Sequence, residues 1–190
     1  MKIKYDYKDI INNINVLDNN NEEEQHSFFI DYFYNTLSSL GESSPDWFQS
    51  ITKIDNYAFE GCEALTSVTI PFGVTSIGDF AFSGCYNLES VTIPDSVTSI
   101  GWSAFSFCHT LTTITIPKNV TKIDDRVFGY CNQLKDVYLY PIIPPTLGGY
   151  DAISSYTTTI HVPVGSGNAY KSATNWSNYA DIIVEDIIVE

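Results

Sequence analysis

Apolar positions recur through the middle of this chain with a step of 23 residues, in six columns that stay in register over four copies. The stretch FEGCEALTSVTIP at 59–71 returns as FSGCYNLESVTIP at 82–94 and as FSFCHTLTTITIP at 105–117. A looser copy, FGYCNQLKDVYLY, occupies 128–140. A fixed step of this length is typical of a solenoid, in which every copy forms one coil.

Each copy predicts two short strands and a turn. The alternation at 67–70 predicts a strand whose apolar side chains point inward, and a proline then ends it. The piece VTSIG at 74–78 predicts a second extended segment, and DFAFSGC at 79–85 predicts a compact turn or a single helical turn. One coil cannot bury its own apolar face, so we expect the coils to stack at about 4.8 Å with their strands in parallel sheets.

The same step continues beyond the four clear copies. Adding 23 to Val137 and Leu139 leads to Ile160 and Val162 in TIHVP, which predicts a degenerate fifth coil. The pentapeptide DIIVE at 181–185 predicts a sixth, capping strand after the helical-looking stretch GNAYKSATNWSNYA. The fold class we predict is an α/β repeat solenoid, a single right-handed one of four to six coils.

Residues 1–50 lie outside the period. They contain an amphipathic stripe with helical spacing, formed by Phe28, Phe29, Tyr32, Phe33, Leu37 and Leu40. We therefore predict a helical N-terminal capping segment at 1–50, four repeats at 51–140, and a degenerate fifth repeat with an irregular C-terminal cap at 141–190. A separate, short helical interaction domain is the alternative for the first segment.

The columns Leu-x-x-Val-x-Ile-Pro, Val-Thr-Ser-Ile-Gly and Ala-Phe-x-x-Cys resemble the BspA-like leucine-rich repeats, whose units have the same length. The resemblance covers 51–140, and the tail IHVPVGSGNAYKSATNW is similar to the closing segment of such proteins. It implies a leucine-rich-repeat solenoid and an adhesin or interaction protein that binds host proteins or other cells, with no catalytic motif to carry over. Such relatives are commonly exported to the surface or secreted, whereas this N-terminus does not resemble a secretory signal peptide. We therefore expect a cytoplasmic or virion-associated chain.

Charge narrows the range of partners. The net charge is −14, from 23 acidic and 9 basic residues. Such a balance repels nucleic-acid backbones and anionic membranes. No apolar run approaches the roughly 20 residues of a membrane helix. We expect neither nucleic-acid binding nor membrane insertion. A basic protein partner would be attracted, although an ordinary solvated surface also explains the charge.

The four cysteines raise the question of metal or disulfide chemistry; they are Cys62, Cys85, Cys108 and Cys131. A zinc site needs ligands in close pairs such as C-x2-4-C, which this sequence does not have. Equivalent side chains of stacked coils point in parallel, which disfavours a disulfide although a Cα spacing of about 5 Å would permit one. We interpret the column as buried structural thiols. No nucleophile–base arrangement or phosphate-binding motif stands out, so the sequence predicts no enzyme, no cofactor and no metal.

The outward face of the repeated strands changes along the chain. One column runs Thr69, Thr92, Thr115, Tyr138 and His161, and the column beside it runs Ser67, Ser90, Thr113, Asp136 and Thr159. The first coils thus present small hydroxyl side chains, as β propensity alone favours. The later coils present large amphipathic and chargeable side chains of the kind that anchor interfaces. We predict a binding face formed by Asp136, Tyr138, Tyr140, His161, Thr113 and Thr115.

Two further features lie elsewhere on the coil. Trp102 occupies a turn position where the other copies have a shorter polar residue, namely Asn56, Asp79 and Asp125. This exception predicts an exposed second anchor, with packing against a neighbouring coil as the alternative. A threonine column on the VTSI piece, formed by Thr52, Thr75, Thr98 and Thr121, raises ice binding as a remote alternative.

These patterns predict a non-enzymatic protein-binding or adhesion module that uses the exposed strand face. Three other classes stay open. The first is a structural or assembly component, such as a virion or surface-array subunit. The second is a binder of a glycan or another small ligand through Tyr138, Tyr140 and Trp102. The third is an intracellular inhibitor of a host protein. The sequence leaves the identity of the partner and the oligomeric state open.

Overall fold

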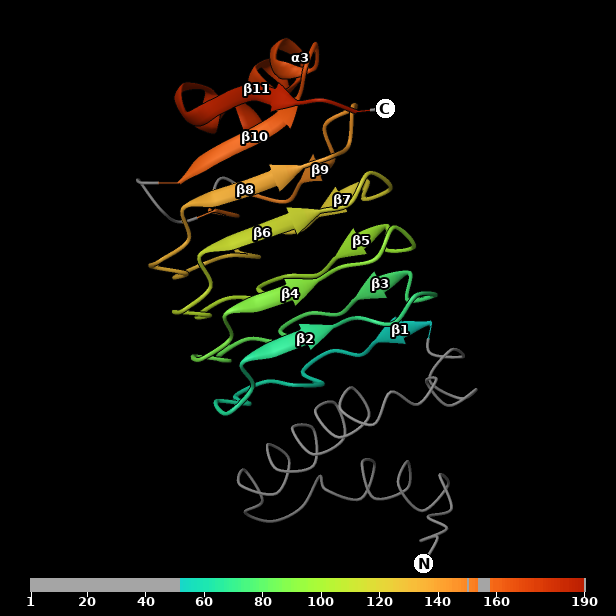
Figure 1. Ribbon diagram of the computed structural model, residues 1–190, viewed down its shortest axis with the longest axis vertical. Helices are drawn as coiled ribbons and strands as arrows, with labels where there is room; N and C mark the ends of the chain where they lie inside the picture. The colour runs from blue at the N-terminus through green and yellow to red at the C-terminus, as the bar shows by residue number, and fades with distance from the viewer. Residues whose placement is uncertain (1–51, 150, 154–157, 190) are drawn as a thin grey trace, which may run out of the picture.

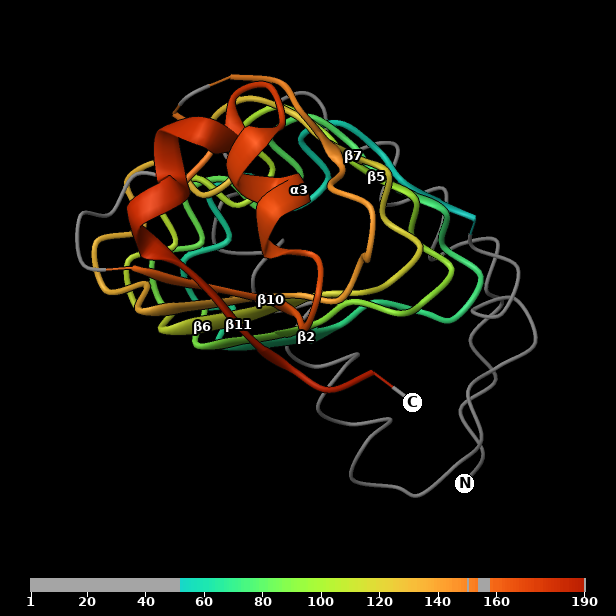
Figure 2. The same ribbon diagram turned by 90° about the horizontal axis from the view of Figure 1, so that it is seen from above.

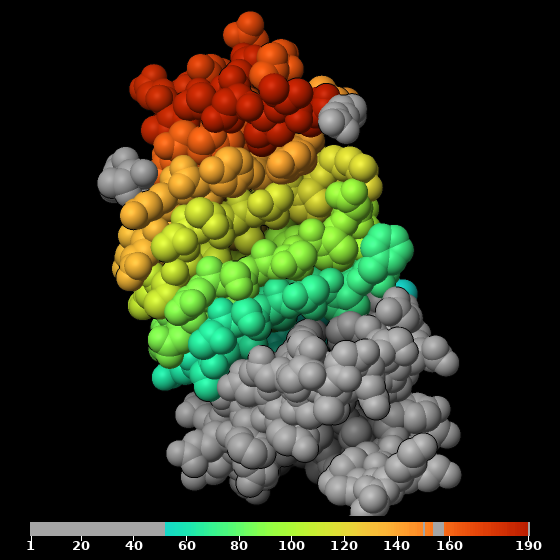
Figure 3. Space-filling view, viewed as in Figure 1, coloured from blue at the N-terminus to red at the C-terminus, as the bar shows by residue number. Residues whose placement is uncertain are grey.

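The computed structural model describes residues 52–149, 151–153 and 158–189. The helical cap predicted for residues 1–50 lies outside them. The described chain winds into stacked coils, and each coil adds short strands beside those of the coil before it (Figure 1). In the space-filling view the coils form inclined parallel layers (Figure 3). The solenoid predicted from the repeat is confirmed.

One side of the coils is a parallel sheet of five two-residue strands. In spatial order these are β1 (Lys53–Ile54), β3 (Ser76–Ile77), β5 (Ser99–Ile100), β7 (Lys122–Ile123) and β9 (Thr146–Leu147). Neighbouring strands pair at the 23-residue step, as Lys53 does with Ser76. The last pair differs, because Lys122 pairs with Thr146. One additional residue therefore lies in the connection that leads into β9.

Another side carries the longer strands that the sequence predicts. They are β2 (Ser67–Thr69), β4 (Ser90–Thr92), β6 (Thr113–Ile116), β8 (Asp136–Leu139), β10 (Thr159–Pro163) and β11 (Ile183–Ile187). β2 pairs with β4, while β6, β8, β10 and β11 form a four-stranded parallel sheet. Figure 1 shows both groups as one ladder, which we call the front sheet. The strand predicted in TIHVP is present, and the one predicted in DIIVE begins two residues later, because Asp181 and Ile182 belong to a 3-10 helix. Ile160 pairs with Ile183 at the same step.

The core consists of the repeated apolar columns. Phe82, Phe105 and Phe128 are fully buried, and their rings stack with centroids 5.2 and 5.9 Å apart. Residues 79–84 form consecutive turns rather than a helical turn. Since Phe82 also stacks on Phe59, Phe82 and Phe105 are each buried between two other phenylalanine rings. This stacking is the packing advantage that a lone coil lacks.

The cysteine column is buried, and it links neighbouring coils. The thiols of Cys85 and Cys131 donate hydrogen bonds to the backbone carbonyls of Phe59 and Phe105, with Sγ–O distances of 3.2 and 3.1 Å. Each acceptor belongs to the preceding coil. A buried carbonyl without a donor costs free energy, so the column satisfies the backbone as well as filling space. The interpretation of these residues as structural thiols is confirmed.

The C-terminal segment closes the last coil. After β10 the chain forms helix α3 (Gly167–Ser172) and the 3-10 helix η2 (Trp176–Ile182) before it returns as β11. Tyr170 and Trp176 are fully buried and meet edge to face with centroids 5.2 Å apart. Seen along the solenoid, the two helices lie over the end of the coils (Figure 2). They cover apolar core that a further coil would otherwise bury.

Candidate functional site

The front sheet brings most of the predicted site residues into one patch. Thr113 pairs in register with Asp136, and Thr115 pairs with Tyr138. Tyr138 in turn pairs with His161 on the next strand. The two threonines are exposed, and the other three side chains are half-buried. Because parallel strands place in-register residues side by side on one face, the patch spans β6, β8 and β10 without a break.

An aromatic stack forms the centre of this patch. The rings of Tyr138 and His161 lie nearly parallel, with centroids 4.4 Å apart and an interplanar angle of 16°. The stack covers one ring face of Tyr138 and leaves the side chain partly exposed. Holding the ring in one orientation lowers the conformational entropy that a partner would have to remove on binding.

His161 also joins three strands through its two ring nitrogens. Nδ1 lies 2.7 Å from Oδ2 of Asp186 on β11, and Nε2 lies 3.1 Å from Oδ1 of Asp136 on β8. Only 13% of the His161 side chain is exposed. A neutral imidazole has one N–H, whereas two carboxylate acceptors are best satisfied by the imidazolium with two. His161 therefore holds the patch together more than it presents itself to solvent.

The electrostatics of His161 follow from these contacts. Partial burial lowers the pKa of its imidazole, but the hydrogen bonds to Asp136 and Asp186 and the charges of the two carboxylates outweigh that effect. The net result is a pKa above the ordinary value of 6.5. The charged form is thus favoured in the folded protein, as expected for a cation between two anions.

Asp186 is a member of this cluster that the sequence reasoning missed. The register of β10 and β11 shifts between Val162 and Pro163, so that Val162 pairs with Glu185 and Pro163 with Ile187. The irregularity leaves Asp186 as the additional residue, and its carboxylate reaches back to His161. Bulges of this kind re-aim a side chain. The 23-residue step of the sequence gives no indication of this contact between Asp186 and His161.

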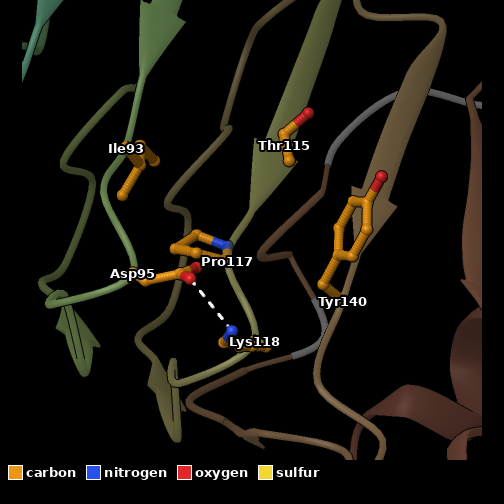
Figure 4. Close-up of a pocket in the computed structure, with 6 residues that line it drawn as sticks. All are labelled: Ile93, Asp95, Thr115, Pro117, Lys118 and Tyr140. Atoms are coloured by element: carbon orange, nitrogen blue, oxygen red, sulfur yellow. Dashed lines mark ion pairs between the residues drawn. The ribbon is translucent and has the colours of Figure 1, made fainter. Parts of the chain in front are cut away.

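Tyr140 and Thr115 contribute to a shallow, open groove beside the patch. The groove has a volume of about 290 Å³ and lies where β4, β6 and β8 end. Its other lining residues are Ile93, Asp95, Pro117 and Lys118 (Figure 4). The Lys118 amine and the Asp95 carboxylate form an ion pair of 3.2 Å across it. The groove therefore combines apolar walls with a locally neutral pair of charges.

Trp102 does not belong to the same patch. It lies in a turn between β5 and β6, with 39% of its surface exposed. Its indole meets the ring of Phe80 edge to face, with the ring centroids 4.6 Å apart. Its backbone N–H donates a hydrogen bond of 2.8 Å to Oδ1 of Asp79. The side chain thus packs against the preceding coil, as the alternative predicted, and remains partly exposed.

The threonine column of the small sheet has a structural explanation. The hydroxyl groups of Thr75, Thr98 and Thr121 donate to the backbone carbonyls of Thr52, Thr75 and Thr98, at distances of 3.0–3.3 Å. Each threonine thus ties its coil to the one before. The regular spacing follows from the stacking of coils, and it needs no ligand on that side.

Two further properties of the described residues bear on other kinds of site. No group of three or more His, Cys, Asp or Glu side chains is placed to hold a metal ion in residues 52–149, 151–153 and 158–189. In the same part of the chain, none of the helices is long and apolar enough to cross a membrane.

Comparisons with known proteins bear on the repeat. A family model described as "BspA type Leucine rich repeat region" matches residues 26–144 in 6 copies. Among solved structures, the chain is similar to a leucine rich repeat protein of T. pallidum, with 32% identity, 60% of this chain and 54% of that chain covered, and a TM-score of 0.55. None of the curated proteins compared with the chain matches it.

A second solved structure extends the comparison. A leucine rich cell surface protein from Faecalibacterium prausnitzii A2-165 shares 26% identity, with 73% of this chain and 34% of that chain covered and a TM-score of 0.51. The chain thus spans about half of the first structure and about a third of the second.

Proposed function

Because this chain belongs to the BspA-type leucine-rich repeat family, we propose that it is a non-enzymatic module that binds a partner protein through the front sheet. The binding face consists of Thr113, Thr115, Asp136, Tyr138 and Tyr140, with His161 stacked beside Tyr138 on the same face. The observation that carries the proposal is the stack of Tyr138 on His161 on β8 and β10, next to strands β2, β4 and β6 that present serine and threonine side chains. Tyrosine rings held in this way are typical energetic centres of interfaces.

The charges of the face favour a basic partner. Asp136 and Asp186 flank His161, and 34% and 47% of their side chains are exposed. The chain as a whole carries a net charge of −14. Electrostatic complementarity of this kind mainly accelerates association and selects among partners. The name of the F. prausnitzii structure describes a cell surface protein, which supports a role in surface interactions.

A capture experiment with two blocking variants tests the proposal. The immobilised chain is exposed to fractionated surface proteins of candidate hosts and neighbouring cells, and captured proteins are quantified by mass spectrometry. Thr113→Arg places a bulky side chain on the exposed face, and Tyr138→Ala removes the ring. Each is expected to reduce specific capture at least tenfold. Tyr138→Ala truncates a central anchor, which costs about 2 kcal/mol or more of binding free energy, and Thr113→Arg obstructs the contact.

Ser67→Arg is the matched control. Ser67 occupies the same column as Thr113, two coils away, and is also exposed. It lies outside the aromatic patch, so its replacement is expected to leave capture unchanged. His161 is kept in all variants because its loss would loosen β11. Equal capture by Thr113→Arg, Tyr138→Ala and the parent chain would show that the binding face has been assigned to the wrong surface.

A further inference from the structure

Exposed apolar side chains gather along one edge of the front sheet. Among the described residues, those exposed beyond the carboxyl ends of its strands include Phe72, Ile142, Ile143, Val164, Ile188 and Val189. Parallel strands end at the same edge, and Figure 1 shows the arrowheads of the front sheet and the C-terminus on one side of the molecule. We call this side the carboxyl edge. They lie after β2, β8, β10 and β11, whereas the loops after β4 and β6 are polar. Exposed apolar groups gathered on one side of a molecule mark an interaction surface more often than an ordinary solvated one.

The most prominent part of the carboxyl edge is the loop at 141–145, with the sequence PIIPP. The equivalent loops after β4 and β6 carry the polar pairs Asp95–Ser96 and Lys118–Asn119. After β8 the loop instead presents Ile142 and Ile143, which are 62% and 82% exposed. The loop also contains the additional residue that moves the pairing of β9 out of the 23-residue step. The repeat therefore does not require these isoleucines.

Buried aromatic residues hold this loop at both ends. The hydroxyl group of Tyr170 donates to the carbonyl of Pro141, and Nε1 of Trp176 donates to the carbonyl of Pro145, both at 2.7 Å. Three prolines in five residues further restrict the backbone. The loop is thus a pre-formed apolar projection, and binding through it would cost little conformational entropy.

A complementary depression lies directly beside the projection. Tyr140, the residue before the loop, lines the groove of about 290 Å³ between the ends of β4, β6 and β8. Ile93 and Pro117 supply further apolar wall, as Figure 4 shows. The only charges among the lining residues, Asp95 and Lys118, neutralise each other. A convex and a concave apolar feature therefore lie next to each other on the same chain, without a net local charge.

We propose that the carboxyl edge is a self-association surface, at which two copies of this chain pack about a two-fold axis with their solenoids antiparallel. With the axis between β6 and β8, Ile142 and Ile143 of each copy enter the groove of the other. The same rotation brings the end of β2 opposite the end of β11 of the second copy. Phe72 would then face Ile188 and Val189, which are otherwise exposed.

Symmetry is the reason to choose a second copy as the occupant. In a two-fold interface the same patch serves both partners, so a projection must lie beside a matching depression on one chain. The carboxyl edge has this arrangement at its centre and apolar groups at both ends. Homodimer interfaces are also more apolar than other interfaces. The Asp95–Lys118 pair leaves the groove without net charge, so the central contact adds no repulsion of its own to that between two chains of net charge −14.

Sedimentation equilibrium and light scattering over a wide concentration range test this proposal. The full chain is expected to approach twice its monomer mass of 21.3 kDa as the concentration rises. Ile142→Ser combined with Ile143→Glu is expected to weaken dimerisation at least tenfold, and Phe72→Ser is expected to weaken it less. Tyr86→Ser removes an aromatic group that is 40% exposed on the turn side, and is expected to leave dimerisation unchanged.

A pair of charge substitutions distinguishes a specific contact from non-specific hydrophobic association. Ile143→Lys would place an ammonium group next to Lys118 of the second copy and is expected to abolish the dimer. Adding Lys118→Glu to the same chain is expected to restore it in part. A monomer at every concentration would overturn the proposal, as would a dimer that the loop substitutions leave unchanged. Neither result would bear on the front-sheet proposal, which is tested by capture with Thr113→Arg.

Discussion

At the scale of single residues, the recurring cysteine combines burial with a hydrogen bond to the neighbouring coil. Burial raises the pKa of Cys85 to about 12, and the nearby thiol of Cys62 adds to the effect. The pKa of Cys108 is raised as well, by its hydrogen bond with Cys131 and by burial. The thiolate is the reactive form of cysteine. These cysteines are therefore held as inert thiols.

Thiol reactivity provides a direct check of this description. We expect the folded chain to react with a disulfide reagent at pH 8 at least a hundredfold more slowly than the urea-unfolded chain, because the thiolate is suppressed and the reagent excluded. The reaction can be followed by absorbance. Rapid labelling of Cys85 or Cys108 in the folded state, mapped by mass spectrometry, would contradict a closed cysteine column.

A second residue-scale prediction concerns backbone conformation. Arg126 has a φ of 54°, in the left-handed region that glycine adopts without steric cost. Its side chain is exposed, and its nearest charge contact, Nε to Oδ2 of Asp125, is 3.8 Å long. Arg126→Gly is therefore expected to raise the free energy of unfolding by about 0.5–1 kcal/mol, measured by urea denaturation. Gln133→Gly, at an exposed position without a positive φ, should lower it. A decrease in both variants would refute the explanation.

At the scale of elements, glycine allows the strands of the small sheet to end close together. A Cβ atom on Gly101 would lie 2.5 Å from Oδ1 and 2.7 Å from the backbone nitrogen of Asp79 in the preceding coil. Gly101→Ala must push these coils apart, and we expect a loss of about 2 kcal/mol of unfolding free energy. The half-buried Ser99 serves as a control, since Ser99→Ala changes the side chain without such a clash. Equal stability of the two variants would mean that the coils are stacked less tightly at Gly101 than the distances to Asp79 indicate.

His161 and the carboxylates of Asp136 and Asp186 form a hydrogen-bonded cluster, which we call the clasp, and it joins β8, β10 and β11. The clasp makes the stability of the C-terminal segment depend on pH. The pKa of His161 in the folded state is above 6.5, because the effect of burial is outweighed by the hydrogen bonds to Asp136 and Asp186. A raised histidine pKa contributes stability that is fully present below about pH 6.5 and is lost as pH rises through the folded-state value. Since both carboxylates are partly exposed, solvent screening limits the contribution to about 1 kcal/mol.

The variant His161→Gln isolates this contribution. It cannot carry the charge, so the difference in urea midpoint between it and the parent chain should be largest near pH 6 and shrink toward pH 9. His109→Gln, which alters a histidine stacked on Tyr86 in the turns, controls for loss of an imidazole. A difference that stays constant over this range, or grows with pH, would rule out a charged clasp.

At the scale of the whole molecule, the repeat explains why so much of the fold was predictable. Val137 and Ile160 occupy equivalent positions in the sequence, and the structure pairs them as neighbours. A one-dimensional stack converts a sequence step into a register, so the strand containing Ile160 could be predicted although its coil has lost the Phe and Cys columns. The same reasoning predicted a patch on β8 and β10, because Tyr138 and His161 replace threonine in one column.

What the period could not predict depends on departures from it. Asp186 contacts His161 only because a bulge changes the register of the last strand pair. Tyr170 and Trp176 fix the ends of the loop that carries Ile142 and Ile143, and neither hydrogen bond follows the 23-residue step. Trp102 breaks its column as Tyr138 does, yet it lies in a turn away from the front sheet. A sequence column shows that a residue differs from its counterparts in the other copies. The coil geometry determines on which side of the solenoid that residue lies.

Hydrogen–deuterium exchange of the chain with and without a captured partner tests the central claim most directly. If the front sheet binds the partner, peptides that cover 113–116 and 136–140 should become protected, while the turns at 102–107 and the small sheet exchange as before. The protected segments should map onto adjacent strands of one face. Protection of the turns around Trp102, with β6 and β8 unchanged, would contradict the account.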